Sequence, residues 1–107
     1  MTTGSRTWKF TQFAGGAFLV NAALHSAKGV TGQRFPTPFS SPPGVGLSSP
    51  GQNLVWGGMN LAISGALLRR LPRTTAEKIT VVAGGVLMAY YLAHYFSGLE
   101  LDERDRP

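Results

Sequence analysis

The chain has 107 residues, a net charge of +5 and no cysteine. This length allows one domain, and the lack of cysteine excludes a disulfide framework and a thiolate metal site. The ten basic residues stand at the edges of apolar segments and form no basic face interleaved with aromatic residues, so we expect no nucleic-acid partner.

The first apolar segment predicts a membrane-spanning helix over about residues 10–27, because it carries no formal charge from Phe10 to Ala27. A cleaved signal peptide is the alternative interpretation. It fits less well, because His25 would stand at the −3 position if cleavage followed Ala27, where a small residue is expected.

Residues 29–51 are rich in proline, glycine and serine and have no helical period, which predicts a loop. A flexible linker would not need the apolar residues Phe35, Phe39, Val45 and Leu47, and a disordered one would carry more charge than Arg34 alone. We therefore expect the loop to lie at the membrane interface and to pack its aromatic rings on the helix ends.

Two further membrane-spanning helices are predicted over about residues 52–70 and 77–98. The first has a small and polar face, which should meet protein rather than lipid: Asn53, Trp56, Gly57, Asn60 and Ser64. The second contains no charged residue from Ile79 to Leu99, and Thr74 or Thr75 can cap it with Glu77 in its first turn. The short connection between these helices predicts that they lie side by side and antiparallel.

A repeat links the first and third predicted helices. Ala-Gly-Gly, eight residues and His occur in Ala14–His25 and again in Ala83–His94. Small residues let membrane helices approach closely, so the glycines within the spans are candidate packing residues: Gly15, Gly16, Gly57, Gly58, Gly65, Gly84 and Gly85.

The basic residues predict the orientation, because they favour the cytoplasmic side. They cluster before the first helix (Arg6, Lys9) and between the second and third (residues 69–78). We expect a multi-pass protein of the inner (plasma) membrane, with the chain 1–107 as one integral membrane domain. Its N-terminus would be cytoplasmic, and the charged tail 100–107 would place the C-terminus outside.

With this topology the first and third helices run parallel and bring polar side chains to one depth. An ionisable residue in a membrane helix is a functional-site hypothesis. The candidate ligand-binding residues are Asn21, His25, Asn53, Trp56, Asn60, Tyr90, Tyr91 and His94. Three interpretations compete: an aromatic belt at the interface, a pocket for a lipid, quinone or other hydrophobic small molecule, and a haem or metal held by the two histidines.

Catalytic residues are not predicted, because the helices offer no acid near a histidine and no Ser-His-acid set. With only two histidines as ligands, we expect no metal site and no cofactor.

The stretch Phe35 to Asn60, FPTPFSSPPGVGLSSPGQNLVWGGMN, resembles small uncharacterised bacterial multi-pass membrane proteins with F-P-T-P-F, P-P-G, S-S-P and N-x-x-W-G in the same order. The resemblance implies a bacterial inner membrane and no particular activity. We expect a non-enzymatic module that associates with itself or with a larger membrane complex. The alternative is a membrane-embedded binding site or a small membrane enzyme built on the polar residues named above.

Overall fold

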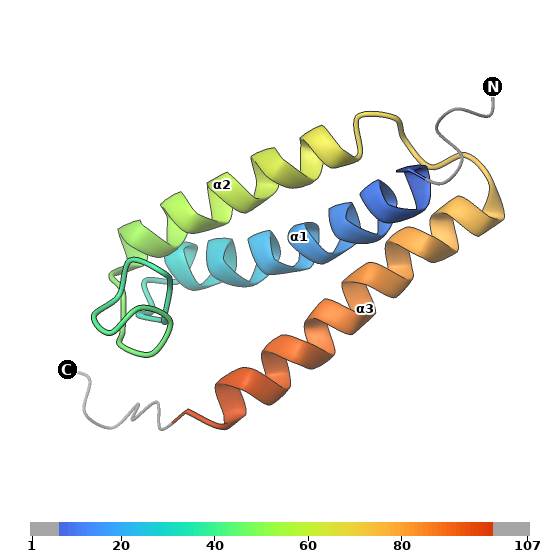
Figure 1. The fold of residues 1–107 in the computed structure, drawn as a ribbon. Helices are drawn as coiled ribbons and strands as arrows, with labels where there is room; N and C mark the ends of the chain where they lie inside the picture. Colours follow the sequence, from blue (N-terminus) through green and yellow to red (C-terminus); the bar gives the residue numbers. More distant parts are fainter. Residues whose placement is uncertain (1–6, 100–107) are drawn as a thin grey trace.

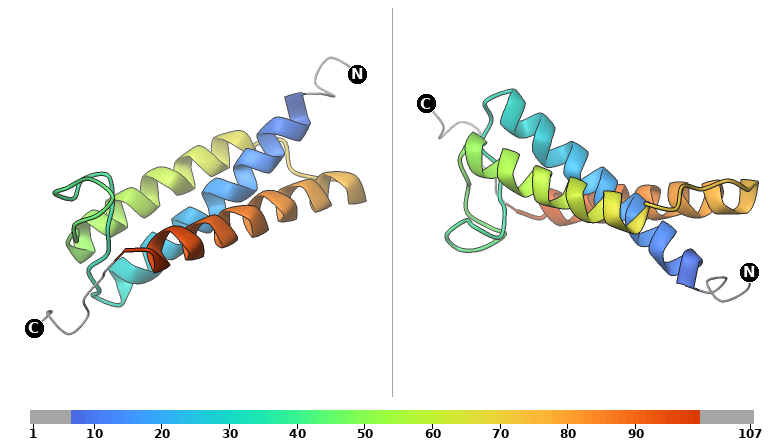
Figure 2. Two further views of the ribbon diagram at one scale, coloured as in Figure 1. Left: turned by 60° about the horizontal axis from the view of Figure 1, so that its bottom comes forward. Right: turned by 90° about the horizontal axis from the view of Figure 1, so that it is seen from above.

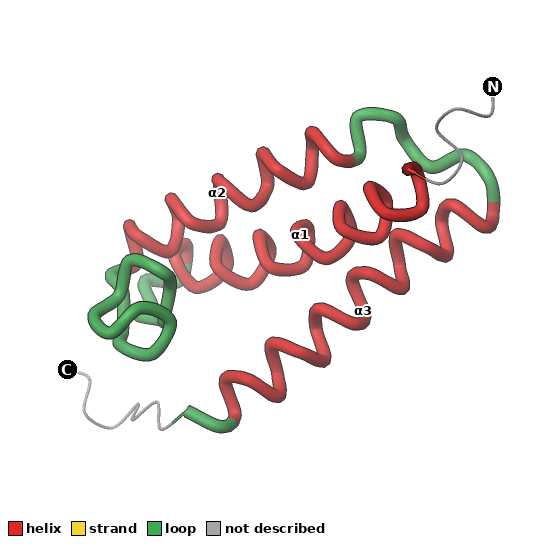
Figure 3. Tube along the Cα trace, viewed as in Figure 1, coloured by secondary structure: helices red, strands yellow, loops and turns green. Residues whose placement is uncertain are grey.

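The computed structural model describes residues 7–99, which form three helices: α1 (Thr7–Val30), α2 (Pro50–Leu67) and α3 (Thr75–Ser97). The described residues contain no β-strand, so the predicted all-α fold with three helices is confirmed. In Figure 1 α1 and α3 run in the same direction and α2 runs against them, as the tube in Figure 3 also shows. The predicted tail 100–107 lies outside the described residues.

The helix boundaries differ from the predicted ones by a few residues. α1 extends to Val30, and α2 ends at Leu67 rather than at residue 70, so the Pro-rich loop comprises residues 31–49. α2 begins early because Ser49 and Gln52 form a capping box around Pro50 in the first turn. The predicted cap of α3 is confirmed, since Thr74 and Glu77 form a second capping box.

α1 is the central helix, and among the three described helices α2 and α3 each pack on α1 and not on each other. Figure 2 shows α1 crossing between its two neighbours. The prediction that α2 and α3 lie side by side is wrong, because the connection 68–74 passes over the start of α1 instead of making a tight hairpin. Gln12 Nε2 donates to the carbonyl oxygen of Arg70 at 3.1 Å, and the Arg70 guanidinium pairs with Glu77 at 2.8 Å.

The buried and exposed residues are distributed in the opposite way to a water-soluble bundle. Within residues 8–99 the buried apolar side chains are few: Ala22, Phe35 and Pro36. Polar side chains fill the helix contacts: Gln12, His25, Asn53, Asn60, Ser64 and Glu77. Large apolar side chains cover the outside, including Leu61 at 55% exposed and Val86 at 63%.

Of the three helices, α3 alone is both long enough and apolar enough to qualify as a membrane span. The prediction of three membrane-spanning helices is therefore not supported by length and hydropathy. The reason lies in the composition of α1 and α2, whose mean hydropathy is lowered by residues such as Gln12, Asn21 and Asn60.

The glycine pairs of the repeat meet where α1 crosses α3. A Cβ atom on Gly16 would collide with the main chain of Val81, and one on Gly84 with the main chain of Phe13. These two helices therefore touch through their backbones, as small residues permit.

The remaining predicted packing glycines divide into two groups. Three lie at helix contacts, Gly85 against Val20 and Gly15 and Gly57 at the contacts of α1 and α2. A Cβ atom on Gly58 or Gly65 would meet nothing within 4 Å. Within the described chain these two glycines pack against no other residue, and their role in packing against a second copy or a larger complex stays a prediction.

The Pro-rich loop is held by a cluster of buried hydroxyl groups. Ser48 Oγ lies 2.5 Å from Thr37 Oγ1 and 2.6 Å from Ser40 Oγ, and Phe35 and Ser48 form an antiparallel β-bridge. The rings of Phe35 and Phe39 pack on helix residues, Phe35 on Phe96 with ring centroids 4.4 Å apart. This packing on the helices is as predicted.

Candidate functional site

Asn53 and His25 are the central pair of the candidate site. Asn53 lies in the first turns of α2 and is fully buried, and His25 lies near the end of α1 and is 2% exposed. His25 Nδ1 is 2.7 Å from Asn53 Oδ1. The pair joins α1 to α2 directly below the loop.

The hydrogen bonds of Asn53 determine which ring nitrogen of His25 carries the proton. Asn53 Nδ2 donates to the carbonyl oxygens of Phe35 at 2.9 Å and Ser49 at 3.1 Å, so the amide nitrogen faces these acceptors and Oδ1 faces the ring. A carbonyl oxygen only accepts, so the neutral imidazole carries its hydrogen on Nδ1. Its Nε2 then presents a lone pair, and it makes no hydrogen bond with the residues that the structure describes.

The ring of His25 lines a hollow of about 220 Å³ beneath the loop, which we call the His25 hollow. All three helices and the loop contribute to it, and none of its lining residues carries a formal charge: Asn21, His25, Pro36, Thr37, Pro38, Gly44, Trp56, Tyr91, Leu92, Tyr95 and Phe96. Tyr95 Oη donates to the carbonyl oxygen of Gly44 at 2.9 Å, which fastens the loop to α3 over the hollow.

A polar row continues from His25 along the contact of α1 and α2. Asn21 Nδ2 donates to Asn60 Oδ1 at 3.0 Å, and Ser64 Oγ donates to the carbonyl oxygen of Gly15 at 2.8 Å. We call the residues Asn21, His25, Asn53, Asn60 and Ser64 the polar seam. Five of the predicted site residues thus lie together, four in the seam and Trp56 beside His25 with ring centroids 6.4 Å apart.

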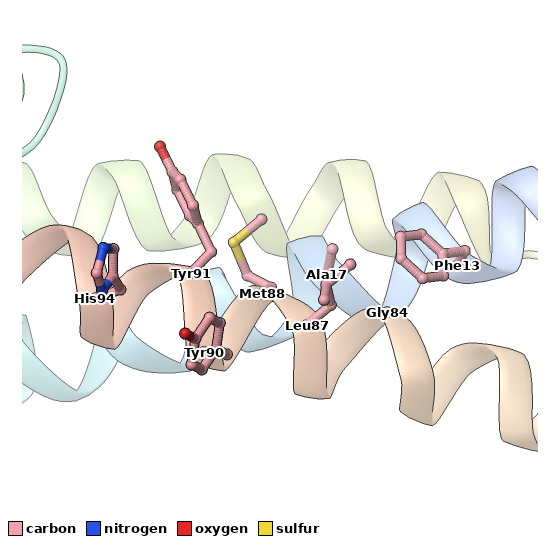
Figure 4. Close-up of a pocket in the computed structure, with 8 residues that line it drawn as sticks. All are labelled: Phe13, Ala17, Gly84, Leu87, Met88, Tyr90, Tyr91 and His94. Carbon is pink, nitrogen blue, oxygen red and sulfur yellow. The ribbon is translucent and has the colours of Figure 1, made fainter.

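His94 and Tyr90 are not brought to this cluster. Both are exposed on α3, where their rings stack on each other with centroids 6.1 Å apart. They line a second hollow of about 430 Å³ between α1 and α3, which we call the outer hollow. Figure 4 shows its lining residues, with Tyr91 and Met88 extending to one side of α3 and Tyr90 to another. His25 is paired with Asn53 and His94 is stacked on Tyr90, so the two histidines do not form the pair that the haem or metal interpretation requires.

The structure therefore gives no support to a metal held between the two histidines. Among the described residues no three His, Cys, Asp or Glu side chains gather as a metal site. Because the first and third helices run parallel, both histidines lie toward the same end of the helices. The parallel direction does not determine how α3 is rotated about its own axis.

Several residues of the site were not predicted from the sequence. Tyr95 and Phe96 complete the wall on α3, and Thr37 lies beneath the loop. Tyr95 follows Tyr91 by four residues, the spacing of one helix face, so this spacing was an available signal. Thr37 gave none, because its contacts depend on the path of the loop.

Comparison with known proteins returned no match: neither a protein-family profile, nor a curated protein, nor a solved structure is significantly similar to the chain. The resemblance of Phe35 to Asn60 to small bacterial membrane proteins stays a prediction.

Proposed function

We propose that this protein is an integral membrane protein whose three helices all cross the bilayer, and that it acts as a non-enzymatic helical module. The observation that carries the proposal is the distribution of side chains, with polar groups buried between the helices and large apolar groups outside. In lipid the apolar exterior costs nothing, whereas in water so extensive an apolar surface is rare on a monomer.

Helix length supports the same proposal. The helices have 24, 18 and 23 residues. At about 1.5 Å per residue they measure roughly 27 to 36 Å, which matches a hydrocarbon core of about 30 Å.

The low hydropathy of α1 and α2 is compatible with membrane spans. A mean over the helix counts seam residues such as Asn53, Asn60 and Ser64, although these residues are at most 1% exposed. The large apolar residues of α2 face outward, for example Leu54, Val55 and Met59. A helix of this kind meets lipid with its apolar side and protein with its polar side.

The proposed partner is a second copy or a larger membrane complex. Gly58 and Gly65 leave open space on the outer side of α2, so another helix can approach the backbone closely there. We propose a cytoplasmic N-terminus, because Lys9 and the basic connection after α2 lie at the same end of the molecule.

Cysteine labelling tests this topology. Ser41→Cys lies in the loop and Leu71→Cys in the connection between α2 and α3, both at exposed positions. In spheroplasts we expect a membrane-impermeant maleimide to label the first variant directly and the second only after permeabilisation. Equal labelling of both variants would overturn the three-span arrangement, and release of the protein by alkaline carbonate would overturn the membrane assignment itself.

A further inference from the structure

We propose that the His25 hollow and the outer hollow together bind a neutral, membrane-soluble compound with one ring bearing a hydroxyl group and an apolar tail, as in an alkylphenol or a quinol. The hydroxyl donates to His25 Nε2. This inference rests on the proposed membrane setting only for the route by which the ligand arrives, because binding itself needs only the folded chain.

The acceptor is a single, oriented atom on a buried residue. His25 is 2% exposed and its Nδ1–H is held by Asn53 Oδ1, so Nε2 is the ring nitrogen available to a ligand in the hollow. A lone pair accepts a hydrogen bond but donates none. At this atom the hydroxyl of a phenol or quinol can therefore bind, whereas the carbonyl oxygen of a quinone cannot.

The aromatic side chains around His25 favour a ligand that has an aromatic ring. Its imidazole makes edge-to-face contacts with Phe35, Trp56 and Phe96, with centroid distances of 5.7, 6.4 and 6.5 Å. Aromatic side chains prefer this geometry with further rings. The hollow of about 220 Å³ suits one substituted ring, since an apolar cavity of about 150 Å³ already admits benzene.

The lack of charged residues around the His25 hollow excludes ionic head groups. None of the residues that line the His25 hollow is an acid, a lysine or an arginine. A phosphate or a carboxylate would lose its hydration there without an ion pair in return. The head group must therefore be neutral.

Tyr91 lies between the ring site and a tail site, because it lines both hollows. Beyond it the outer hollow of about 430 Å³ is lined mainly by apolar side chains, among them Phe13, Ala17 and Met88. Figure 4 shows Tyr91 and Met88 next to each other along α3 and extending to the same side of the helix. A ligand with its ring below the loop can thus lay an alkyl tail along α1 and α3, toward the middle of the helices.

The test compares two probes that differ at one group, which can donate a hydrogen bond in the first and cannot in the second. The full chain in detergent is titrated with 4-hexylphenol and with 4-hexylanisole, in which a methyl group replaces the hydroxyl hydrogen. We expect 4-hexylphenol to bind about tenfold more tightly, because it donates a hydrogen bond to His25 Nε2 that 4-hexylanisole lacks. Equal affinity of the unaltered protein for the two probes would overturn the proposal without any mutation.

Two variants test where the parts of the ligand lie. His25→Leu should abolish the preference for the phenol. Circular dichroism checks that this variant is folded. If the folded variant still prefers the phenol, the acceptor lies elsewhere. Met88→Trp should fill the outer hollow and weaken 4-hexylphenol more than 4-methylphenol; equal weakening of both would contradict the tail site. These outcomes are independent of the labelling experiment, because a failed three-span topology leaves the phenol preference in detergent unaffected.

Discussion

Asn53 uses both ends of its amide group, and in doing so connects three separate parts of the chain. Nδ2 donates to Phe35 in the loop and to Ser49 at the start of α2, while Oδ1 accepts from His25 on α1. The bonds to Phe35 and His25 are buried, and an unpaired polar group in a buried position costs more than a formed bond contributes. The residue therefore determines the loop conformation and the orientation of the imidazole at once.

Replacing Asn53 by leucine keeps the size of the side chain and removes all of these bonds. We expect Asn53→Leu to lower the free energy of unfolding by about 2–3 kcal/mol, because buried partners on three segments lose their hydrogen bonds. The measurement is reversible unfolding in mixed micelles. Asn21→Leu is the matched comparison: Asn21 makes one side-chain hydrogen bond, to Asn60, so its loss should cost about 1 kcal/mol. A smaller effect at Asn53 than at Asn21 would contradict this account.

At the scale of the helices, the contact of α1 with α3 depends on glycine at the crossing point. Gly16 and Gly84 each stand where a Cβ atom would collide with main-chain atoms of the other helix. A backbone cannot yield as a flexible side chain can, so the helices would have to separate. Gly58 and Gly65 have the same chemistry and open space around them.

The same substitution should therefore have opposite effects at the two kinds of position. We expect Gly84→Ala to destabilise the fold, since α1 and α3 must move apart and lose dispersion contacts along their length. Gly65→Ala should be neutral or should stabilise the fold by up to about 1 kcal/mol, because alanine is the better helix former. Thermal unfolding in detergent measures both variants. Equal shifts in the two would show that the crossing is not as close as described.

The positions of the helices along the chain could be predicted well from the sequence. Which face each helix turns toward its neighbours could be predicted only in part. The repeat indicated that Gly16 and Gly85 are packing residues, and each lies half a turn from the histidine of its own helix. On α1 the side opposite Gly16 is covered by α2, so His25 is buried, but α3 has no second helix against it among the described residues, and His94 is exposed. The number of neighbours of each helix follows from the path of the connection 68–74, for which the sequence offers no periodic signal.

At the scale of the whole molecule, the polar contacts between the helices and the apolar residues on the outside belong to one arrangement. A seam of amide, imidazole and hydroxyl groups supplies contacts between α1 and α2 that the hydrophobic effect would not supply in lipid. Hydropathy averages could identify α3 alone, because in α1 and α2 the polar seam and the apolar outer side contribute to one mean. Only the three-dimensional arrangement separates the two sides.

A charge placed on the outer side of α2 discriminates between lipid and water around that helix. Leu61 lies in the second half of α2 and is 55% exposed, so in water Leu61→Asp would disturb little. In a bilayer an aspartate near the centre of a span costs about 2.5–3.5 kcal/mol on insertion scales, so we expect a large loss of membrane-inserted protein. Val45→Asp, in the loop at 45% exposed, is the matched control and should insert as the unaltered chain does. Carbonate-resistant membrane fractions quantify both variants. If the two variants insert equally well, α2 does not meet lipid, and the three-span proposal fails at the helix where hydropathy is weakest.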